Sequence, residues 1–473
     1  MKITFTPEKN STAITFTEGT QNRFVEKDGG TSLSIGYGKD KTLARRKAIL
    51  FLRKIISVAK QNKLKSIALD WEEVRRIVSS DVTDTDLGQI LAVSLSMANF
   101  DFVAYKTKPK DGFPFVEVVS LLNASKDLQK DIRRGEIIGA EVNAARELSN
   151  MPGGDMTPKI LAAAAKKAIA GTTATLKVLG TKEMQKLGMG AVLGIAKGST
   201  EEPQFIVMEY WGSPSTPKGR SGQQKPVVFV GKGVTFDSGG LNIKPGDHMY
   251  EMHLDMSGGA SVIHAVALAA KLKIKANVIG LVPAVENMPG NNAVRPGDML
   301  TSLSGKTIEI LNTDAEGRVI LADGITYAKR YDPAVVVDVA TLTGAVLTAL
   351  GTQASGLMSN DQQLEDDLRA LGEVSGDYVW PFPLWDEYED MVKGTFGDVP
   401  NISTSGNSRD GGVIAGGMFL REFAKELGCP WAHLDIASRM TATSGEFLSK
   451  GSVGAPVRLL LALAEHYAKR TDR

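Results

Sequence analysis

Cysteine is nearly absent from this sequence, and the lone Cys429 excludes an intramolecular disulfide framework and indicates a reducing compartment. No apolar run reaches the length that spans a membrane, and no apolar secretory segment follows Met1. An excess of charge is also lacking, since 55 basic and 54 acidic residues leave a formal net charge of +1. That balance predicts no strong attraction to nucleic acid, membranes or acidic substrates. We therefore expect a cytoplasmic protein without a membrane partner.

Histidine is scarce as well. None of the five histidines lies in a ligand pattern such as H-E-x-x-H, and His433 is expected to be a core residue on a strand. The sequence therefore gives no sign of a histidine-based metal site. The remaining composition, with 42% hydrophobic and 23% charged residues, is typical of a soluble globular enzyme, and 473 residues can bury a large core.

The first third of the chain predicts a smaller N-terminal α/β domain. Strands are predicted within residues 2–16, 33–37, 66–69 and 115–121, and helices at residues 42–58 and 86–97. The basic face of the first helix, with Arg45, Arg46 and Lys47, is predicted to be a solvated surface rather than a nucleic-acid patch.

A long helical pattern over residues 125–149 ends before Pro152 and Gly153. We therefore place a domain boundary there, with residues 1–153 as the N-terminal domain and its connecting helix, and residues 154–473 as a larger C-terminal domain. In the latter, helices such as residues 257–272 alternate with strands at residues 176–179, 205–210, 227–230, 278–282 and 335–339. This pattern predicts an α/β fold with a mostly parallel or mixed sheet flanked by helices.

The densest group of chemically active side chains is the run from Asn312 to Arg318, which reads NTDAEGR. It lies between a short predicted strand and a helical pattern, and ligands bind at such turns in open α/β sheets. Two carboxylates this close repel each other, and Arg318 can neutralise only one of them. A divalent metal would compensate both.

A second candidate stretch, GKGVTFDSGG at residues 231–240, follows a buried strand and carries Lys232 and Asp237. Its glycines allow the backbone to bend tightly around whatever these two side chains hold. Lys244 and Asp255 follow shortly afterwards.

From about Ala145 onward, the sequence resembles the leucyl aminopeptidases of the dinuclear-zinc type, also called cytosol aminopeptidases. The run from Asn312 to Arg318 matches the family signature, with Val319 where leucine is usual. The motifs around Lys232 and Asp237 match in order and spacing, as do ENMP at residues 286–289, RPGD at 295–298, DVATLTGA at 338–345 and WAHLDIA at 431–437.

The resemblance implies two divalent metal ions. Five residues are implied as ligands, namely Lys232, Asp237, Asp255, Asp314 and Glu316. Four carboxylates are the supply that two cations about 3.5–4 Å apart require. A lysine amine among oxygens favours zinc, manganese or cobalt over magnesium or calcium.

The resemblance also implies the catalytic parts. Metal-activated water would attack a peptide carbonyl, Lys244 would stabilise the oxyanion, and Arg318 would hold a bicarbonate that acts as general base. Backbone contacts to bicarbonate are implied for Ala315, Gly317 and Leu342, and a substrate pocket is implied for Met252, Asn312, Thr341 and Gly344. A structural salt bridge from Arg318 to a metal-ligating carboxylate stays open as an alternative.

We therefore predict an aminopeptidase that releases N-terminal, leucine-like residues from peptides, and the resemblance implies a homohexamer. Two alternatives of other classes remain: a catalytically silent hexameric scaffold that keeps the fold, and a DNA-binding regulator acting through its N-terminal domain. The complete set of expected ligands argues against the first. The near-neutral charge does not favour a nucleic-acid partner.

Overall fold

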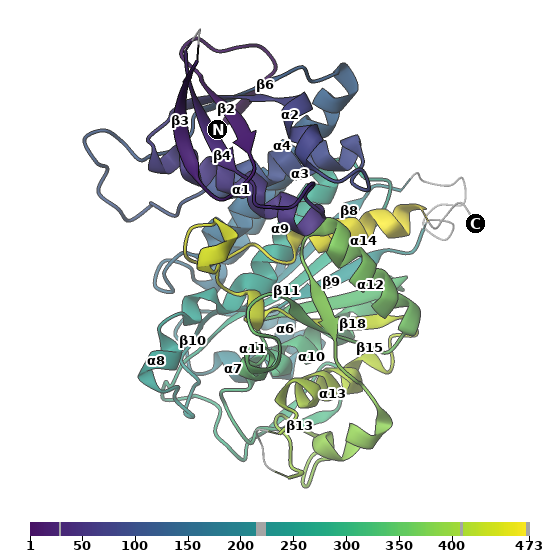
Figure 1. Ribbon diagram of the computed structural model, residues 1–473. Coiled ribbons are helices and arrows are strands. Elements are labelled where there is room, and N and C mark those ends of the chain that lie inside the picture. Colours follow the sequence, from purple (N-terminus) through teal and green to yellow (C-terminus); the bar gives the residue numbers. More distant parts are fainter. Residues whose placement is uncertain (28–29, 214–223, 407–409, 470–473) are drawn as a thin grey trace. The chain divides into compact units, whose positions relative to one another are not determined.

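The computed structural model describes residues 1–27, 30–213, 224–406 and 410–469 (Figure 1). The chain forms two compact units. The first comprises Met1–Asn143 and Ala442–Lys450, and the second comprises Ala144–Thr441 and Gly451–Arg473. The division falls within helix α4 (Lys126–Ser149), whereas the sequence pattern places a boundary after this helix, at Gly153. Within the described ranges, no helix is long and apolar enough to cross a membrane.

The first unit is built on a six-stranded sheet with the order β1-β6-β5-β2-β4-β3. Its strands are β1 (Lys2–Thr4), β2 (Thr12–Thr17), β3 (Asn22–Lys27), β4 (Gly30–Gly36), β5 (Ser66–Asp70) and β6 (Val118–Leu122). All neighbours pair in parallel except the edge strand β3, which pairs antiparallel with β4. The sheet and its helices form the α/β arrangement that the sequence predicts.

The helices of this unit are α1 (Arg45–Gln61), α2 (Trp71–Ile77) and α3 (Asp84–Asn99), together with the first part of α4. Helix α1 buries an apolar stripe that includes Phe51 and Ile55, and it packs against α3. Arg45 pairs with Asp86 of α3 at 2.5 Å, and Lys47 pairs with Asp40 at 2.7 Å. Two of the three residues in the basic run therefore have acidic partners.

The second unit is built on a nine-stranded mixed sheet with the order β16-β15-β18-β14-β9-β11-β8-β7, and β10 pairs separately with β11. Its strands are β7 (Thr175–Leu179), β8 (Gln204–Trp211), β9 (Val227–Gly231), β10 (Gly233–Asp237), β11 (Asn277–Asn287), β14 (Val335–Ala340), β15 (Ser355–Ser359), β16 (Val379–Pro381) and β18 (Trp431–Asp435). The three central strands β9, β14 and β18 are buried throughout, and the continuous apolar run of β9 predicts this for that strand.

Helices cover both faces of this sheet (Figure 1). One face carries α5 (Pro158–Ala168), α9 (Ser257–Lys271), α12 (Gln362–Ser375) and α14 (Val457–Lys469). The other carries α7 (Gly190–Ala196), α10 (Glu316–Ala328) and α13 (Gly412–Ala424). Val228 and Val230 alternate with their neighbours along β9 and join the core beneath α10 and α13.

The remaining elements of the second unit are short. They are α6 (Thr181–Leu187), α8 (Gly246–Met249), α11 (Gly344–Leu350), and a three-stranded sheet of β12 (Met299–Thr301), β13 (Thr307–Glu309) and β17 (Val399–Pro400). Because β9 and β14 are parallel neighbours, the loops that follow them, at Lys232 and Thr341, emerge at the same edge of the sheet. The carboxyl ends of strands in open α/β sheets form ligand-binding crevices.

Candidate metal centre and adjoining cavity

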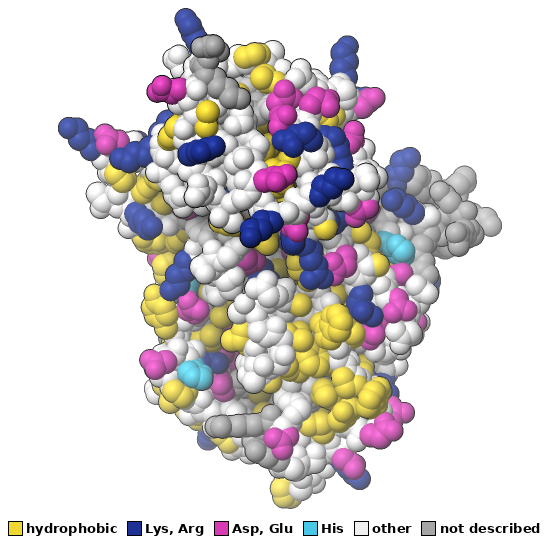
Figure 2. Space-filling view, viewed as in Figure 1, with side chains coloured by type: hydrophobic (Ala, Val, Ile, Leu, Met, Phe, Trp, Pro, Cys, Tyr) yellow, Lys and Arg dark blue, Asp and Glu magenta, His cyan; other side chains and the backbone are white. Residues whose placement is uncertain are grey.

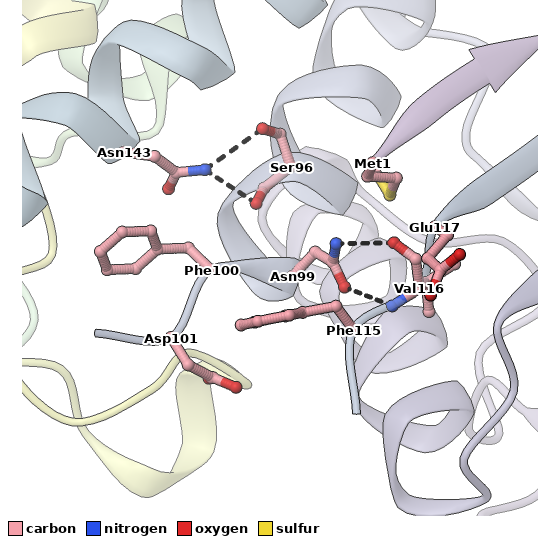
Figure 3. A pocket seen from close by; sticks show the side chains of 9 residues that line it. All are labelled: Met1, Ser96, Asn99, Phe100, Asp101, Phe115, Val116, Glu117 and Asn143. Atoms are coloured by element: carbon pink, nitrogen blue, oxygen red, sulfur yellow. Dashed lines mark hydrogen bonds between the residues drawn. The ribbon is translucent and has the colours of Figure 1, made fainter. Parts of the chain in front are cut away.

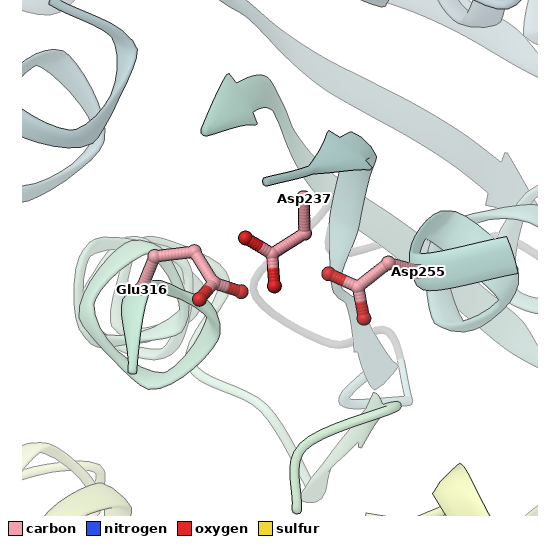
Figure 4. Close-up of side chains that lie close together, drawn as sticks. All are labelled: Asp237, Asp255 and Glu316. Carbon is pink, nitrogen blue, oxygen red and sulfur yellow. The ribbon is translucent and has the colours of Figure 1, made fainter. Parts of the chain in front are cut away.

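Three buried carboxylates converge at this edge of the sheet. Asp237 ends β10, Asp255 lies in the 3-10 helix η2 (Met252–Met256), and Glu316 begins α10 (Figure 4). One oxygen from each lies within 4.8 Å of the others, and the three residues are at most 3% exposed. Buried carboxylates this close require a cation.

Two lysines and a fourth carboxylate complete the cluster. Lys232 Nζ lies 2.9 Å from Asp255 Oδ2 and 2.9 Å from Glu316 Oε1. Lys244 Nζ lies 2.8 Å from Asp237 Oδ2 and 2.5 Å from Asp314 Oδ1. The fold thus brings together the five residues predicted as metal ligands and the predicted oxyanion lysine. They come from three separate segments of the chain, at positions 232–244, 255 and 314–316. Four carboxylates against two ammonium groups leave an excess of negative charge when all are ionised.

Burial and the neighbouring charges shift the pKa values of five of these groups. Burial raises the pKa of Asp314 to about 6 and that of Glu316 to about 7, and it raises the pKa of Asp255 as well. Burial alone would lower the pKa of Lys232 and of Lys244, but the surrounding carboxylates outweigh it and raise both. The cluster therefore attracts positive charge.

Three buried carboxylate oxygens in the cluster each pair with a lysine ammonium: Asp255 Oδ2 and Glu316 Oε1 lie 2.9 Å from Lys232 Nζ, and Asp314 Oδ1 lies 2.5 Å from Lys244 Nζ. Carboxylate oxygens gathered beside an amine nitrogen are a donor set that suits a divalent transition-metal ion. The residues present therefore fit the metal ions that the sequence analysis predicts.

Backbone geometry explains how these side chains are placed. Gly239 and Gly240 have φ of +86° and +63°, a left-handed conformation that favours glycine, and they turn the chain sharply after β10. The Thr313 hydroxyl donates to the Gly239 carbonyl at 2.6 Å and accepts from Asn242 N at 2.8 Å. It ties the loop after β10 to the loop before α10, which carry the two halves of the site.

Asn287 was named in the sequence analysis only as part of a matching motif. In the structure it ends β11, and its Nδ2 donates to Asp237 Oδ1 at 2.8 Å and to the Thr313 carbonyl at 2.9 Å. Gly239 N donates to the same Asp237 oxygen at 2.9 Å. Asp237 is therefore oriented from two directions, and the only sequence signal for Asn287 is its place in the ENMP motif.

A cavity of about 660 Å³ adjoins the cluster. Asp314 belongs to both, so the cavity opens directly onto the carboxylates. Of the residues predicted to contact substrate or bicarbonate, Asn312, Ala315, Arg318, Leu342 and Gly344 line this cavity. Its apolar wall consists of Leu342, Ala345, Ala349, Phe382, Ile402, Val413 and Ile414.

The other predicted contact residues lie elsewhere. Thr341 is buried against the cluster, where its hydroxyl donates to Asp255 Oδ1 at 2.7 Å and its carbonyl accepts from Lys232 Nζ at 3.0 Å. Gly317 faces the Lys232 side chain. Met252 is half-buried at the start of η2 and is not part of the cavity wall.

Arg318 is a buried cation in the cavity wall. It is 8% exposed, and among the described residues its guanidinium has neither an ion pair nor a hydrogen bond, with Nε fully enclosed. Burial lowers its pKa to about 10, so it stays charged near neutral pH. The alternative of a salt bridge from Arg318 to a carboxylate of the cluster is not seen within the described ranges. A buried unpaired cation facing a cavity is suited to holding an anion.

The first unit has a separate cavity of about 400 Å³ (Figure 3). Its polar groups are largely used within the protein: Asn99 hydrogen-bonds to both the amide and the carbonyl of Val116, and Asn143 Nδ2 donates to the Ser96 carbonyl. None of the predicted site residues lines it. The chemistry is therefore concentrated in the second unit.

Comparisons with known proteins agree with this placement. The model of the cytosol aminopeptidase family, catalytic domain, matches residues 143–461. The chain is 44% identical over 400 residues to the probable cytosol aminopeptidase of Azoarcus sp. (strain BH72), covering 82% of this chain and 77% of that protein. It is 39% identical over 437 residues to the probable cytosol aminopeptidase of Nitrosomonas europaea, covering 92% and 84%. Among solved structures, the bottromycin maturation enzyme BotP in complex with Mn superposes with a TM-score of 0.84 at 26% identity, covering 97% of this chain and 99% of that one.

Proposed function

Since this chain belongs to the cytosol aminopeptidase family, and is thus a metal-dependent aminopeptidase, we propose that it uses two divalent metal ions to release N-terminal, leucine-like residues from peptides. The observation that carries this proposal is the cluster of four carboxylates and two lysines at the mouth of the cavity. The gathering of buried carboxylate oxygens around the Lys232 amine supports a role as ligands.

In this proposal, the metal ions are held by Lys232, Asp237, Asp255, Asp314 and Glu316. When bound, such ions acidify water and polarise a carbonyl oxygen. Lys232 would ligate as a neutral amine, and its proton would leave because a nearby divalent cation disfavours the ammonium form. We expect zinc or manganese at this site. The similar enzyme BotP was solved in complex with manganese.

Lys244 is proposed to stabilise the negative charge that develops on the scissile carbonyl oxygen. Its Nζ lies between Asp237 and Asp314, the second of which lines the cavity. An ammonium group fixed by two carboxylates needs little reorganisation when charge appears on the substrate.

Arg318 is proposed to hold a bicarbonate, which would supply a general base when bound. The unpaired guanidinium supports this role, together with the cavity positions of Ala315 and Leu342. Gly317 is proposed to contact the bicarbonate through its backbone, since the side-chain position of this glycine faces Lys232. A planar guanidinium is suited to a planar oxyanion.

The cavity is proposed to take the substrate, with Asn312 and Gly344 in its wall. Met252 and Thr341 stay proposed substrate contacts at the cluster side. No observation in the described part of the chain supports a silent scaffold, since all of the proposed ligands are present in the cluster. None supports a DNA-binding regulator either, since Arg45 and Lys47 have acidic partners.

We also propose a cytoplasmic homohexamer. The second unit exposes Trp380, Trp385 and Phe396 to 55%, 62% and 88%, and Figure 2 shows hydrophobic side chains gathered on one of its faces. Exposed apolar patches commonly mark protein contacts. Light scattering of the purified chain would give the subunit number.

The test of the exopeptidase assignment compares two small substrates. A free α-amine is basic and suits the acidic cluster, whereas an acetylated amine has lost its basicity and carries added bulk. We expect leucine amide to be hydrolysed and N-acetyl-leucine amide to be left intact, at the same metal concentration and pH. Comparable turnover of both compounds would overturn the assignment.

A further inference from the structure

The loop that follows β14 connects the two parts of the site. Its first residue, Thr341, donates to Asp255 Oδ1 and accepts from Lys232 Nζ. The next residues, Leu342 and Thr343, line the cavity. A shift of this loop would therefore disturb the carboxylate cluster and the cavity wall together.

One buried carboxylate holds this loop from behind. Asp435 ends β18 and pairs with Ala340 at the end of β14. Its Oδ1 accepts from Leu342 N at 3.1 Å and from Ala437 N at 3.2 Å, and its Oδ2 accepts from the Thr343 hydroxyl at 2.6 Å. A carboxylate accepts several such bonds at once, and charge makes them stronger than bonds between neutral groups.

Asp435 itself is part of neither the cavity nor the cluster. It is 0% exposed, is absent from the cavity wall and is not one of the three clustered carboxylates. Burial raises its pKa, and His433 on the same strand opposes this effect. Placing a carboxylate here is costly, and the four donors from residues 342, 343 and 437, which include Thr343 N at 3.4 Å, offset that cost.

We propose that Asp435 is a positioning residue of the aminopeptidase reaction, which fixes Thr341 on the metal-ligand cluster and fixes Leu342 and Thr343 in the cavity wall. This inference rests on the proposed function of that site. It predicts that loss of the Asp435 carboxylate weakens substrate binding as well as turnover, because the wall moves with the cluster.

The test uses Asp435→Asn with Asp323→Asn as its matched control. Asp323 is also 0% exposed and also accepts backbone bonds, from Val192 N at 3.0 Å and Leu303 N at 2.7 Å, but these segments lie outside the cavity wall. With leucine amide and saturating metal, we expect Asp435→Asn to lower kcat/KM by about 10–100-fold, the scale seen when groups supporting a metal site are removed, with a rise in KM. Asp323→Asn should keep kcat/KM and KM at the wild-type values, because its hydrogen bonds lie outside the cavity wall.

KM separates positioning from mere folding, because loss of folded protein lowers the active fraction and leaves KM unchanged. Thr343→Val removes the hydroxyl that donates to Asp435 and should raise KM similarly, whereas Thr343→Ser keeps the hydroxyl and should have a lower KM than Thr343→Val. This pair carries the test if Asp435→Asn does not fold. If the wild type is active and either Asp435→Asn or Thr343→Val has the same KM as the wild type, the positioning role is overturned. An inactive wild type would instead overturn the proposed function.

Discussion

Gly317 faces Lys232 so closely that a Cβ built on the glycine would lie 2.4 Å from the lysine Cε and 2.6 Å from its Nζ. Both residues are buried, and Lys232 is held by Asp255 and Glu316. The glycine of the NTDAEGR motif therefore provides the space for the lysine, and any side chain there would push the amine away from the carboxylates.

Gly317→Ala should accordingly lower kcat/KM by about 100-fold, the scale expected for a displacement of about 1 Å in an active site. Steady-state kinetics with leucine amide measures the effect. Gly154→Ala is the control, because a Cβ there meets nothing within 4 Å and its φ is not in the left-handed range. Wild-type activity in Gly317→Ala would show that Lys232 need not occupy its observed position.

Lys244→Ala should lower kcat by roughly 10²–10³, the usual effect of losing an oxyanion donor. Bound metal, measured by elemental analysis of the dialysed protein, should remain unchanged, because the proposed ligands are still present. A parallel loss of metal would reassign Lys244 to the support of Asp237 and Asp314, from which its Nζ lies 2.8 Å and 2.5 Å.

Arg318→Ala should remove the response of the enzyme to bicarbonate. In buffer depleted of carbon dioxide, we expect wild-type activity to fall and to recover when bicarbonate is added, and we expect the variant to stay low in both conditions. Arg421→Ala is the control, since Arg421 pairs with Asp386 and Glu389 at the surface. Equal stimulation of Arg318→Ala and the wild type would contradict the proposed anion site.

Asp323 should make the stability of the protein depend on pH. Burial raises its pKa to about 7, against the effect of its backbone hydrogen bonds, whereas an aspartate in the unfolded chain has a pKa of about 3.9. The native state thus binds the Asp323 proton more tightly than the unfolded chain does. The stability that this proton contributes is fully present below about pH 4 and is lost as the pH rises through about 7. Urea unfolding of the wild type and Asp323→Asn across this range should show the wild type losing stability relative to the variant. A constant difference between them would mean that Asp323 does not titrate there.

The parts of the fold that the sequence predicts well are those with a strong local signal. The buried runs of β9 and β14 and the helical spacing of α1 and α10 are recognisable without a structure. Strand β10 was missed because two glycines and Asp237 suggest a loop, although the segment pairs in parallel with β11. Strand β3 (Asn22–Lys27) was missed because it is a polar edge strand without a continuous apolar run.

In the site, too, the features that the sequence predicts are those with a local signal. Asp314 and Glu316 lie two residues apart in one motif, so their mutual repulsion is visible in the sequence. The contacts from Thr341 to Asp255 and from Asp435 to Leu342 join residues far apart in the chain, and no periodicity encodes them. Such contacts depend on which strands become neighbours, and the sequence pattern does not give that order.

The first compact unit is discontinuous, because it takes its last segment, Ala442–Lys450, from the far end of the chain. Within it, the Ser449 hydroxyl donates to the Phe100 carbonyl at 2.9 Å. On the ribosome, this unit therefore emerges first but is completed late, after the stretch from Ala144 to Thr441 has been translated, which at about 5–20 residues per second takes on the order of tens of seconds. A nonsense mutation shortly after Thr441 would consequently leave the N-terminal unit incomplete, even though every residue from Met1 to Asn143 had been made.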